Sequence, residues 1–271
     1  PVSYSAIRRA NELNFGKSII PSYDFSKAKT IVSFGADFLS TWLMPTVFSC
    51  QYGEKRNPDG KWMSKHFQFE AIMSVTGSNA DYRAMTKPSE EESVLRYILA
   101  KLNKKTASIS KSLKSTADAA VKSLKESGKE SLVVCGTNNT GIQQLVNEIN
   151  NLLGANGTTI DLYNELNLFQ SEEAKMLDFV DSMAKGNKPD VVLFYNSNPV
   201  YSLPNGADFA KELKKVKTSV SMNSHGDETS SLCTFMCPAH HSLETWSDFN
   251  AKTNHYALAQ PMITPLHNTA S

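Results

Sequence analysis

The residues best suited to bind a metal ion lie toward the carboxyl-terminal end of this sequence. Thiolate and imidazole groups, which tetrahedral zinc prefers as ligands, are supplied there by Cys233, Cys237, His240, His241 and His255. A zinc site needs three or four such ligands that converge, and the sequence contains no CxxC pair and no HxxxH pair. The spacing therefore favours ordinary strand and loop positions, and we expect no metal site in this region.

Carboxylates near the same segment have the chemistry of general acids and bases, namely Glu228, Glu244 and Asp248. The loops around them equally suit capping and hydrogen bonding to the backbone, and we favour that interpretation. No Ser–His–Asp or Cys–His arrangement has a recognisable spacing in the sequence. We therefore expect no catalytic residues here.

Polar turns that follow predicted strands are the best candidates for a ligand site. They begin at Gly35, Gly136, Asn196 and Asn223, and each continues through two further small or polar residues. Backbone N–H groups in such turns can cradle a pyrophosphate. However, none of the turns matches GxGxxG or a P-loop, and every α/β fold needs turns of this kind. The turns alone therefore do not specify nucleotide binding.

Short apolar runs alternate with helical patterns along the chain, which predicts mostly parallel sheets with right-handed crossovers. The run at 190–195 is typical of a strand buried on both faces of a parallel sheet. The predicted strands are 30–34, 65–75, 131–135, 158–162, 190–195 and 216–222. The predicted helices are 3–14, 45–52, 89–102, 115–127, 142–153, 171–184 and 207–215. This pattern predicts an α/β fold.

The alternation restarts after the glycine-containing turn at 154–157. We therefore expect two Rossmann-like α/β lobes, residues 1–155 and 156–271, that face each other across a cleft. The chain has no initiator Met and is interpreted as a fragment of a longer polypeptide.

Composition excludes several classes of partner. The 271 residues carry a net charge of +1, so no field of one sign is available to hold nucleic acid or anionic lipid. No stretch approaches the ~20 apolar residues of a membrane span. The four cysteines lack iron–sulfur spacing, and Cys50 and Cys135 are predicted to be buried small hydrophobic residues.

Several segments together resemble the molybdopterin oxidoreductase superfamily. Residues 29–39, followed by Trp42, Pro45 and Arg56, are similar to the first lobe's strand and glycine turn. The stretch 190–204 resembles the strand and Asn-Pro turn of the second lobe. The segments 227–229, 233–238 and 243–246 resemble the superfamily's Glu-Thr pair, apolar strand and Trp/Glu loop, although the strand ends here in Cys-Pro instead of Leu-Pro.

The match is closer to one branch, the B subunit of bacterial alternative complex III. The similar segments are 69–70, 73–81, Arg83, 87–89, 201–204 and 260–266. In this family the B subunit is a large iron–sulfur polypeptide of a membrane-bound quinol oxidoreductase, and its molybdopterin-like region carries no molybdenum cofactor. The resemblance spans nearly the whole chain.

This resemblance implies a cofactor-free, molybdopterin oxidoreductase-like scaffold in the iron–sulfur subunit of a respiratory complex. Such a scaffold would support electron transfer from quinol to cytochrome c or a terminal oxidase. The implied partners are a multihaem cytochrome c and integral membrane quinol-binding subunits, and the implied location is the periplasmic side of the bacterial inner membrane. Iron–sulfur clusters are expected elsewhere in the full polypeptide.

Departures from the cofactor-binding pattern favour the scaffold. The glycine-rich loop expected after residues 154–157 is missing, no Cys, Ser or selenocysteine stands at a molybdenum-ligand position, and the leading cluster-binding cysteines are absent. The first alternative is a genuine oxidoreductase fragment that binds molybdopterin guanine dinucleotide, and the second is a soluble nucleotide-binding module. Under the first alternative the cofactor-binding residues would be Gly35, Asp37, Asn196, Asn198, Pro199, Glu228 and Thr229.

Overall fold

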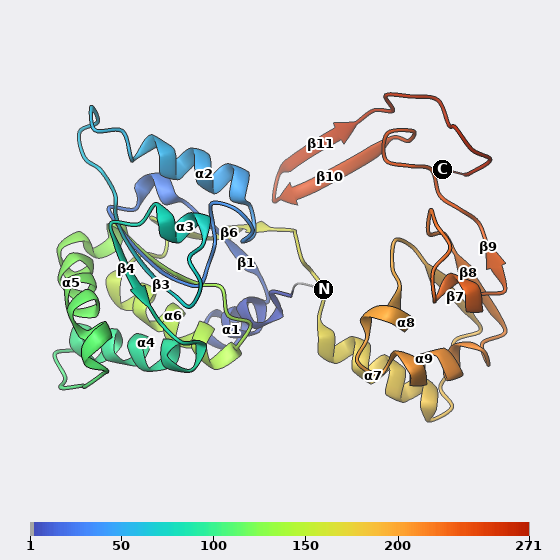
Figure 1. Ribbon diagram of the computed structural model, residues 1–271, viewed down its shortest axis with the longest axis horizontal. Coiled ribbons are helices and arrows are strands. Elements are labelled where there is room, and N and C mark those ends of the chain that lie inside the picture. The colour runs from blue at the N-terminus through green and yellow to red at the C-terminus, as the bar shows by residue number, and fades with distance from the viewer. Residues whose placement is uncertain (1–2, 271) are drawn as a thin grey trace. The chain divides into compact units, whose positions relative to one another are not determined.

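The computed structural model describes residues 3–270, which form two compact units. The first unit contains residues 4–170 and 251–254, and the second contains 171–250 and the residues from 255 onward. Each unit has its own parallel sheet, flanked by helices (Figure 1). The chain therefore has the α/β class that the sequence predicts.

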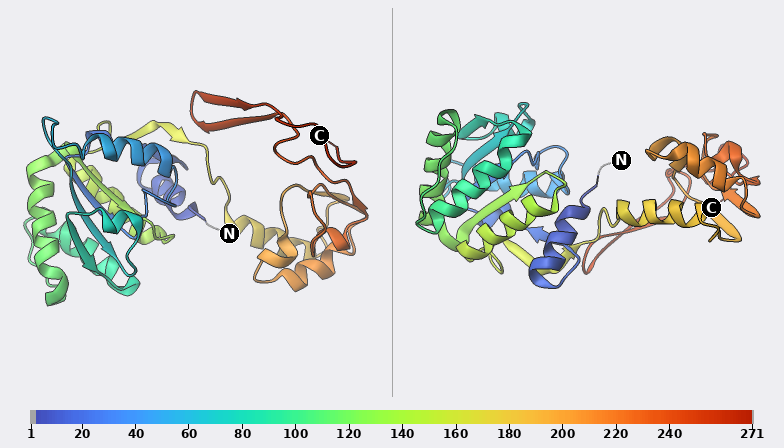
Figure 2. Two further views of the ribbon diagram at one scale, coloured as in Figure 1. Left: turned by 45° about the horizontal axis from the view of Figure 1, so that its top comes forward. Right: turned by 90° about the horizontal axis from the view of Figure 1, so that it is seen from below.

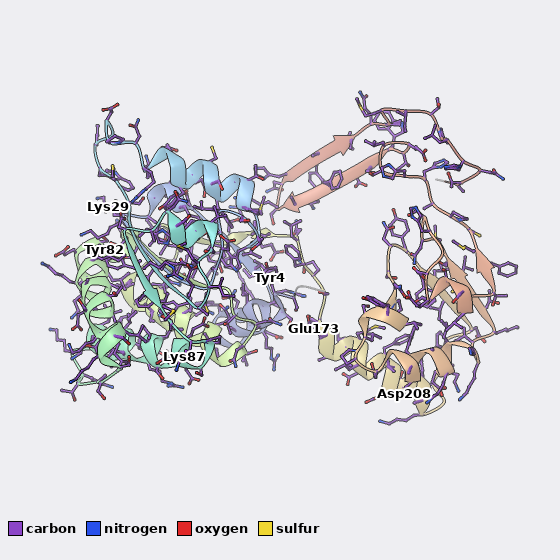
Figure 3. All side chains as sticks on the ribbon, in the orientation of Figure 1. Tyr4, Lys29, Tyr82, Lys87, Glu173 and Asp208 are labelled. Atoms are coloured by element: carbon purple, nitrogen blue, oxygen red, sulfur yellow. The ribbon has the colours of Figure 1, made fainter. Side chains whose placement is uncertain are left out.

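A four-stranded parallel sheet forms the centre of the first unit, in the order β4-β3-β2-β5. Its strands are β2 (Thr30–Phe34), β3 (Lys65–Glu70), β4 (Tyr82–Met85) and β5 (Ser131–Cys135). Strand β3 ends earlier than the predicted 65–75, because Ser74 caps the short helix α3 (Val75–Ser78) through its side chain. Tyr82, labelled in Figure 3, stacks on Phe67 across β4 and β3 with ring centroids 4.8 Å apart.

Helices and strands cover both faces of this sheet. Helices α4 (Pro88–Leu102), α5 (Lys111–Ser127) and α6 (Thr140–Leu153) lie together beside the sheet (Figure 1), and Val32, Phe34 and Phe69 pack against them on one face. Ile31, Leu132 and Val134 pack on the other face. That second layer contains α1 (Ser5–Phe15), the 3-10 turn Phe25–Lys27 and α2 (Pro45–Glu54).

An antiparallel sheet, which the alternation did not predict, extends the first unit. In the first unit it consists of β1 (Ile20–Tyr23), β6 (Ile160–Leu166) and the end of β10 (Ser247–Lys252), whereas the rest of β10 and β11 (His255–Ala259) are grouped with the second unit. Strand β6 pairs antiparallel with β1, and Lys252 lies opposite Leu166. The expected division between residues 155 and 156 thus falls inside the first unit, because β6 completes it rather than opening a second lobe.

The second unit is a three-stranded parallel sheet in the order β7-β8-β9. Its elements are α7 (Glu173–Ala184), β7 (Val191–Phe194), α8 (Pro199–Ser202), α9 (Gly206–Leu213), β8 (Thr218–Ser221), the 3-10 turn Ser230–Leu232 and β9 (Phe235–Met236). Phe194 packs with Val180 and Met183 of α7 and with Phe209 and Leu213 of α9. Helices α7 and α9 lie on the same side of these strands (Figure 2).

The other face of the β7-β8-β9 sheet is open within the described residues. Val191 and Leu193 are 55% and 63% exposed, so the prediction that this strand is buried on both faces is wrong. The register places Leu193 beside Val220, and Val220 beside the exposed Phe235. The connection from β8 to β9 contains only a 3-10 turn, so it supplies no helix to cover this face.

Cys135 is buried in the first core as predicted, whereas Cys50 is exposed, which corrects the prediction for that residue. Helix α2 turns Phe48 and Tyr52 toward the core. Cys50 lies two residues from each of them and therefore projects from the opposite side of the helix. Among residues 3–270 no helix is long and apolar enough to cross a membrane.

Candidate functional site: polar clusters at the strand ends

The first sheet reverses its strand order between β2 and β5, which is where ligands bind in open α/β sheets. The predicted turns at Gly35 and Gly136 meet at this point. A Cβ on Gly136 would lie 2.6 Å from the Gly35 carbonyl oxygen, so the two backbones are in direct contact. Gly35 also has φ +57°, a conformation that favours glycine. The glycines thus permit close packing of the two turns.

Glu91 from α4 reaches over these turns, and it was not singled out by the sequence. Its side chain is buried, and Oε2 accepts a hydrogen bond from the Thr137 hydroxyl at 2.7 Å. The other oxygen, Oε1, lies 3.4 Å from the position that a Cβ on Gly35 would take. Burial raises the pKa of the Glu91 carboxyl, and the bond from Thr137 only partly offsets this. The carboxyl group therefore occupies the switch point itself.

Asp37 follows Gly35 and is used inside the fold. Its Oδ1 accepts hydrogen bonds from the Thr76 backbone N–H at 3.1 Å and from the Thr76 hydroxyl at 2.7 Å. The same Thr76 oxygen accepts a bond from the Leu39 N–H at 3.0 Å. Asp37 therefore ties the segment after β2 to α3, a structural role that accounts for its carboxylate.

A second buried carboxylate, Glu70, anchors the residues after β3. Glu70 Oε1 accepts from Arg83 Nε at 2.7 Å and from the Ser74 N–H at 3.2 Å. Glu70 Oε2 accepts from the Ser74 hydroxyl at 2.7 Å and from Gln68 Nε2 at 3.0 Å. Burial alone would raise the pKa of Glu70, but the bonds from Ser74, Arg83 and Gln68 together lower it. This carboxylate is thus fully satisfied and ionised.

His66 and Gln68 extend this network along the same face of β3. The His66 Nε2 atom lies 3.2 Å from Gln68 Oε1, and Nδ1 lies 3.2 Å from the Tyr52 hydroxyl. Burial lowers the pKa of His66 to about 4, so the imidazole is neutral at neutral pH. Hydrogen bonds therefore link Tyr52, His66, Gln68 and Glu70 into one continuous chain.

In the second unit, the Asn-Pro turn after β7 is bonded to the segment 227–229. The Asn198 amide oxygen accepts from the Thr229 hydroxyl at 2.7 Å and from the Thr229 N–H at 3.3 Å. The Asn198 amide nitrogen donates to Glu228 Oε2 at 2.6 Å, and this bond lowers the pKa of Glu228. Pro199 begins α8, and Asn196 adopts φ +47°. The candidate residues Asn198, Glu228 and Thr229 are therefore brought together and bonded to one another.

Asn223 holds the adjacent turn in the same way. Its Oδ1 accepts from the Ser197 N–H at 3.2 Å, and its Nδ2 donates to the Ser197 carbonyl at 2.8 Å and to Asp227 Oδ2 at 2.6 Å. Asp227 also accepts from the Ser230 N–H at 2.7 Å. The turns after β7 and β8 thus form a single hydrogen-bonded cluster.

The candidate metal ligands and acids are not assembled into a reactive site. The described residues contain no group of three or more His, Cys, Asp or Glu side chains that could hold a metal ion. Glu244 accepts backbone bonds from His241 and Leu266, each at 3.0 Å, and these bonds lower its pKa. Cys233 is half-buried and Cys237 is exposed, while Asp248 is exposed in β10. Glu244 thus serves as a hydrogen-bond acceptor between the loop and the tail.

The phosphate-rich cofactor of the first alternative, molybdopterin guanine dinucleotide, does not fit the hydrogen-bonding groups of these turns. The Gly35 and Gly136 N–H groups donate within the sheet, to Phe69 and Phe34. A carboxylate also contacts the turns of each unit, Glu91 in the first unit and Glu228 in the second. A carboxylate repels the negative charge of a phosphate. The N–H groups of Gly35 and Gly136 are therefore engaged within the sheet, and the Asn198 amide nitrogen is engaged with Glu228.

Sequence reasoning missed the buried residues His66, Gln68, Glu70 and Glu91. The pattern His-Phe-Gln-Phe-Glu suggests a strand with aromatic residues inward and polar residues outward. In the structure both faces of β3 are buried, so the polar residues are internal as well. The run of charged residues at the start of α4 gave no signal that distinguished Glu91 from the exposed Glu92.

Comparisons with known proteins were made against family models, curated proteins and solved structures. No family model matches the sequence. A segment is 36% identical over 89 residues to the menaquinone reductase molybdopterin-binding-like subunit of Nitratidesulfovibrio vulgaris, which covers 31% of this chain and 13% of that protein. The chain thus spans a small part of this relative's length.

Two solved structures share the fold. Acetylene hydratase from Pelobacter acetylenicus matches with a TM-score of 0.62 and 10% identity, over 98% of this chain and 48% of that chain. The formyltransferase/hydrolase complex from Methylorubrum extorquens matches with a TM-score of 0.58 and 11% identity, over 98% of this chain and 79% of that chain. At this identity the likeness shows the fold alone. The chain thus shares its α/β fold with acetylene hydratase, and one segment of it is similar to part of a subunit whose name describes it as molybdopterin-binding-like.

Proposed function

We propose that this chain is a cofactor-free, molybdopterin oxidoreductase-like scaffold within the iron–sulfur subunit of a membrane-bound respiratory quinol oxidoreductase. The complex is of the alternative complex III type, and the scaffold supports electron transfer from quinol to cytochrome c or a terminal oxidase. The observation that carries the proposal is the internal bonding of the strand-end polar residues. Asn198, Glu228 and Thr229 bond to one another, and Glu91 bonds to Thr137.

Membership in a quinone-linked complex is supported by the related curated protein, whose name is that of a subunit of a menaquinone reductase. The partners that we propose are a multihaem cytochrome c and integral membrane quinol-binding subunits. The proposed location is the periplasmic side of the bacterial inner membrane. Iron–sulfur clusters would lie elsewhere in the full polypeptide, because the described residues hold no cluster of ligands.

The test is elemental analysis of the complex purified from its native membrane through a tag on this polypeptide. We expect iron and haem together with quinol oxidation activity, and no stoichiometric molybdenum or tungsten. A stoichiometric content of either metal, with pterin released on denaturation, would instead support the genuine molybdopterin oxidoreductase. A polypeptide recovered alone from the soluble fraction, with bound nucleotide, would support the nucleotide-binding module.

A further inference from the structure

We infer that the ligand site at the switch point of the first sheet is filled by the protein itself, with the Glu91 carboxyl in the place of a bound phosphate. This inference rests on the proposed function and names the group that keeps nucleotide phosphates out of the first unit. Glu91 reaches the switch point from α4, and its two oxygens face the turns after β2 and β5. The site therefore contains the Glu91 side chain, in addition to lacking a glycine-rich motif.

The space between the two turns is closed by backbone. Gly136 packs on Gly35 so closely that a Cβ would lie 2.6 Å from the carbonyl oxygen and 2.9 Å from the carbonyl carbon of Gly35. Glu91 Oε1 then covers Gly35 from the side of α4. A phosphate could approach these turns only after the Glu91 side chain moved away.

The polar side chains of the loop 137–139 are also used internally, residue by residue. The Thr137 hydroxyl donates to Glu91 at 2.7 Å, and Asn138 Oδ1 accepts from the Ala6 N–H of α1 at 2.9 Å. Asn139 caps α6 by accepting from the Ile142 N–H at 3.2 Å. The side chains of residues 137–139 are thus all engaged within the first unit, and that of Asn139 takes up one of the N–H groups at the start of α6.

Electrostatics acts in the same direction. The burial that raises the pKa of Glu91 shows that this carboxyl lies in a medium of low polarity, where an incoming phosphate would lose its hydration. If the carboxyl is ionised it repels the phosphate, and if it is neutral it still fills the volume. The volume filled by the Glu91 side chain is thus the primary reason that a phosphate is excluded.

Amide chemical-shift mapping of the 271-residue chain, with GDP and inorganic pyrophosphate as probes, tests this inference. The wild-type chain is expected to show no saturable shifts at Gly35, Gly136 or Thr137. Glu91→Ala empties the site, and we expect it to bind pyrophosphate at least about tenfold more tightly than wild type, with shifts at Thr137. Glu92→Ala is the matched control, because it removes the same charge from an exposed position of the same helix and should behave as wild type.

Glu91→Gln separates occupancy from charge, because it keeps the side chain's volume and can still bond to Thr137. Failure of this variant to bind pyrophosphate supports occupancy, whereas binding equal to that of Glu91→Ala overturns it. If Glu91→Ala does not fold, Glu91→Ser takes its place. If a folded Glu91→Ala or Glu91→Ser variant shows no saturable shifts with pyrophosphate, the inference is also overturned.

The outcomes distinguish this inference from the proposed function. Saturable shifts with GDP at Asn196, Asn198 or Thr229 of the wild-type chain would contradict the cofactor-free scaffold and leave the filled switch point intact. Saturable shifts at Gly35, Gly136 or Thr137 of the wild-type chain would contradict the filled switch point itself.

Discussion

Glu70 in the first unit is buried and accepts four hydrogen bonds, from Ser74, Gln68 and Arg83, whereas Glu228 in the second unit is exposed and accepts one from Asn198. The sheets around them differ in the same sense. The first sheet is covered on both faces, and the second leaves Val191 and Leu193 exposed. The strand-end carboxylate Glu70 is therefore buried in the first unit, whereas Glu228 of the second unit is exposed beside the buried residues Asn223 and Thr229.

The difference follows from which helices and strands pack against each sheet. The crossovers of the first unit place α4, α5 and α6 on one face and α1, α2 and β1 on the other. Side chains such as His66 and Glu70 are then removed from water and need internal partners. In the second unit only α7, α8 and α9 are available, and they lie on one face. Glu228 therefore keeps access to water there, although Asn223 and Thr229 of the same cluster are buried.

Glu70→Ala should give the largest effect, since it leaves Arg83, Gln68 and Ser74 without their acceptor in a buried site. We expect a loss of about 3 kcal/mol in the free energy of unfolding, the usual cost of breaking a buried charge pair. Urea denaturation of the 271-residue chain measures this. Glu92→Ala is the control, because its exposed pair with Arg96 should be worth no more than about 0.5 kcal/mol. Similar losses in the two variants would remove the distinction between buried and exposed carboxylates.

The pH dependence of stability tests His66. Its pKa is about 4 in the folded state and 6.5 when unperturbed, so the unfolded chain binds a proton that the native state rejects between these values. Stability from this group is complete above about pH 6.5 and is lost as the pH falls toward 4. From pH 7 to pH 5 the loss should be about 2 kcal/mol.

His66→Gln should lack this component, because glutamine does not titrate and can still hydrogen-bond to Gln68 and Tyr52. His225→Gln, at an exposed position, is the matched control and should keep the wild-type slope. Unfolding free energies of the three proteins at pH 7, 6 and 5 provide the measurement. Parallel pH profiles for wild type and His66→Gln would show that the buried imidazole is not the titrating group.

These buried polar residues also mark the limit of what the sequence predicts. Residues 30–34 and 131–135 were identified as strands with the observed bounds, because continuous apolar runs are typical of a doubly covered sheet. The run at 190–195 gives the same signal, yet β7 is covered on one face only. Periodicity records which side chains are apolar and carries no information about which helices will be present to cover them.

Only part of the candidate site was predicted from the sequence. The turns containing Gly35, Asn198 and Asn223 were found because turn chemistry is local. Glu91, the partner of Thr137, was not found, because the two residues are far apart in sequence. Glu228 and Thr229 were named only through the family resemblance, since they too are far from Asn198 in sequence. The strand β1 was not among the predicted strands, because its pairing with β6 depends on residues more than a hundred positions away.

Asn198→Ala probes the hydrogen-bonded cluster of the second unit. Removal of the amide leaves the Thr229 hydroxyl and N–H without their acceptor, and we expect a loss of about 1 kcal/mol in the free energy of unfolding. If the region is a scaffold, quinol oxidation by the assembled complex should be nearly unchanged. Thermal stability and turnover measured on one preparation decide this. A large loss of turnover in an iron-replete complex of unchanged stability would favour a cofactor site at this turn.

Leu193→Ser should have the smallest effect, even though leucine stands here in the middle of a strand. The side chain is 63% exposed, so little apolar surface leaves water when this unit folds, and substitution at such a position usually changes stability by no more than about 0.5 kcal/mol. Phe194→Ala, one residue further along β7, removes a ring buried against α7 and α9 and should cost about 3 kcal/mol. Urea denaturation of the two variants therefore compares the stability contributed by side chains on the two faces of β7. A loss above about 1.5 kcal/mol for Leu193→Ser in the isolated chain would mean that the face is covered in solution, and the contrast between a doubly covered and a singly covered sheet would then no longer hold.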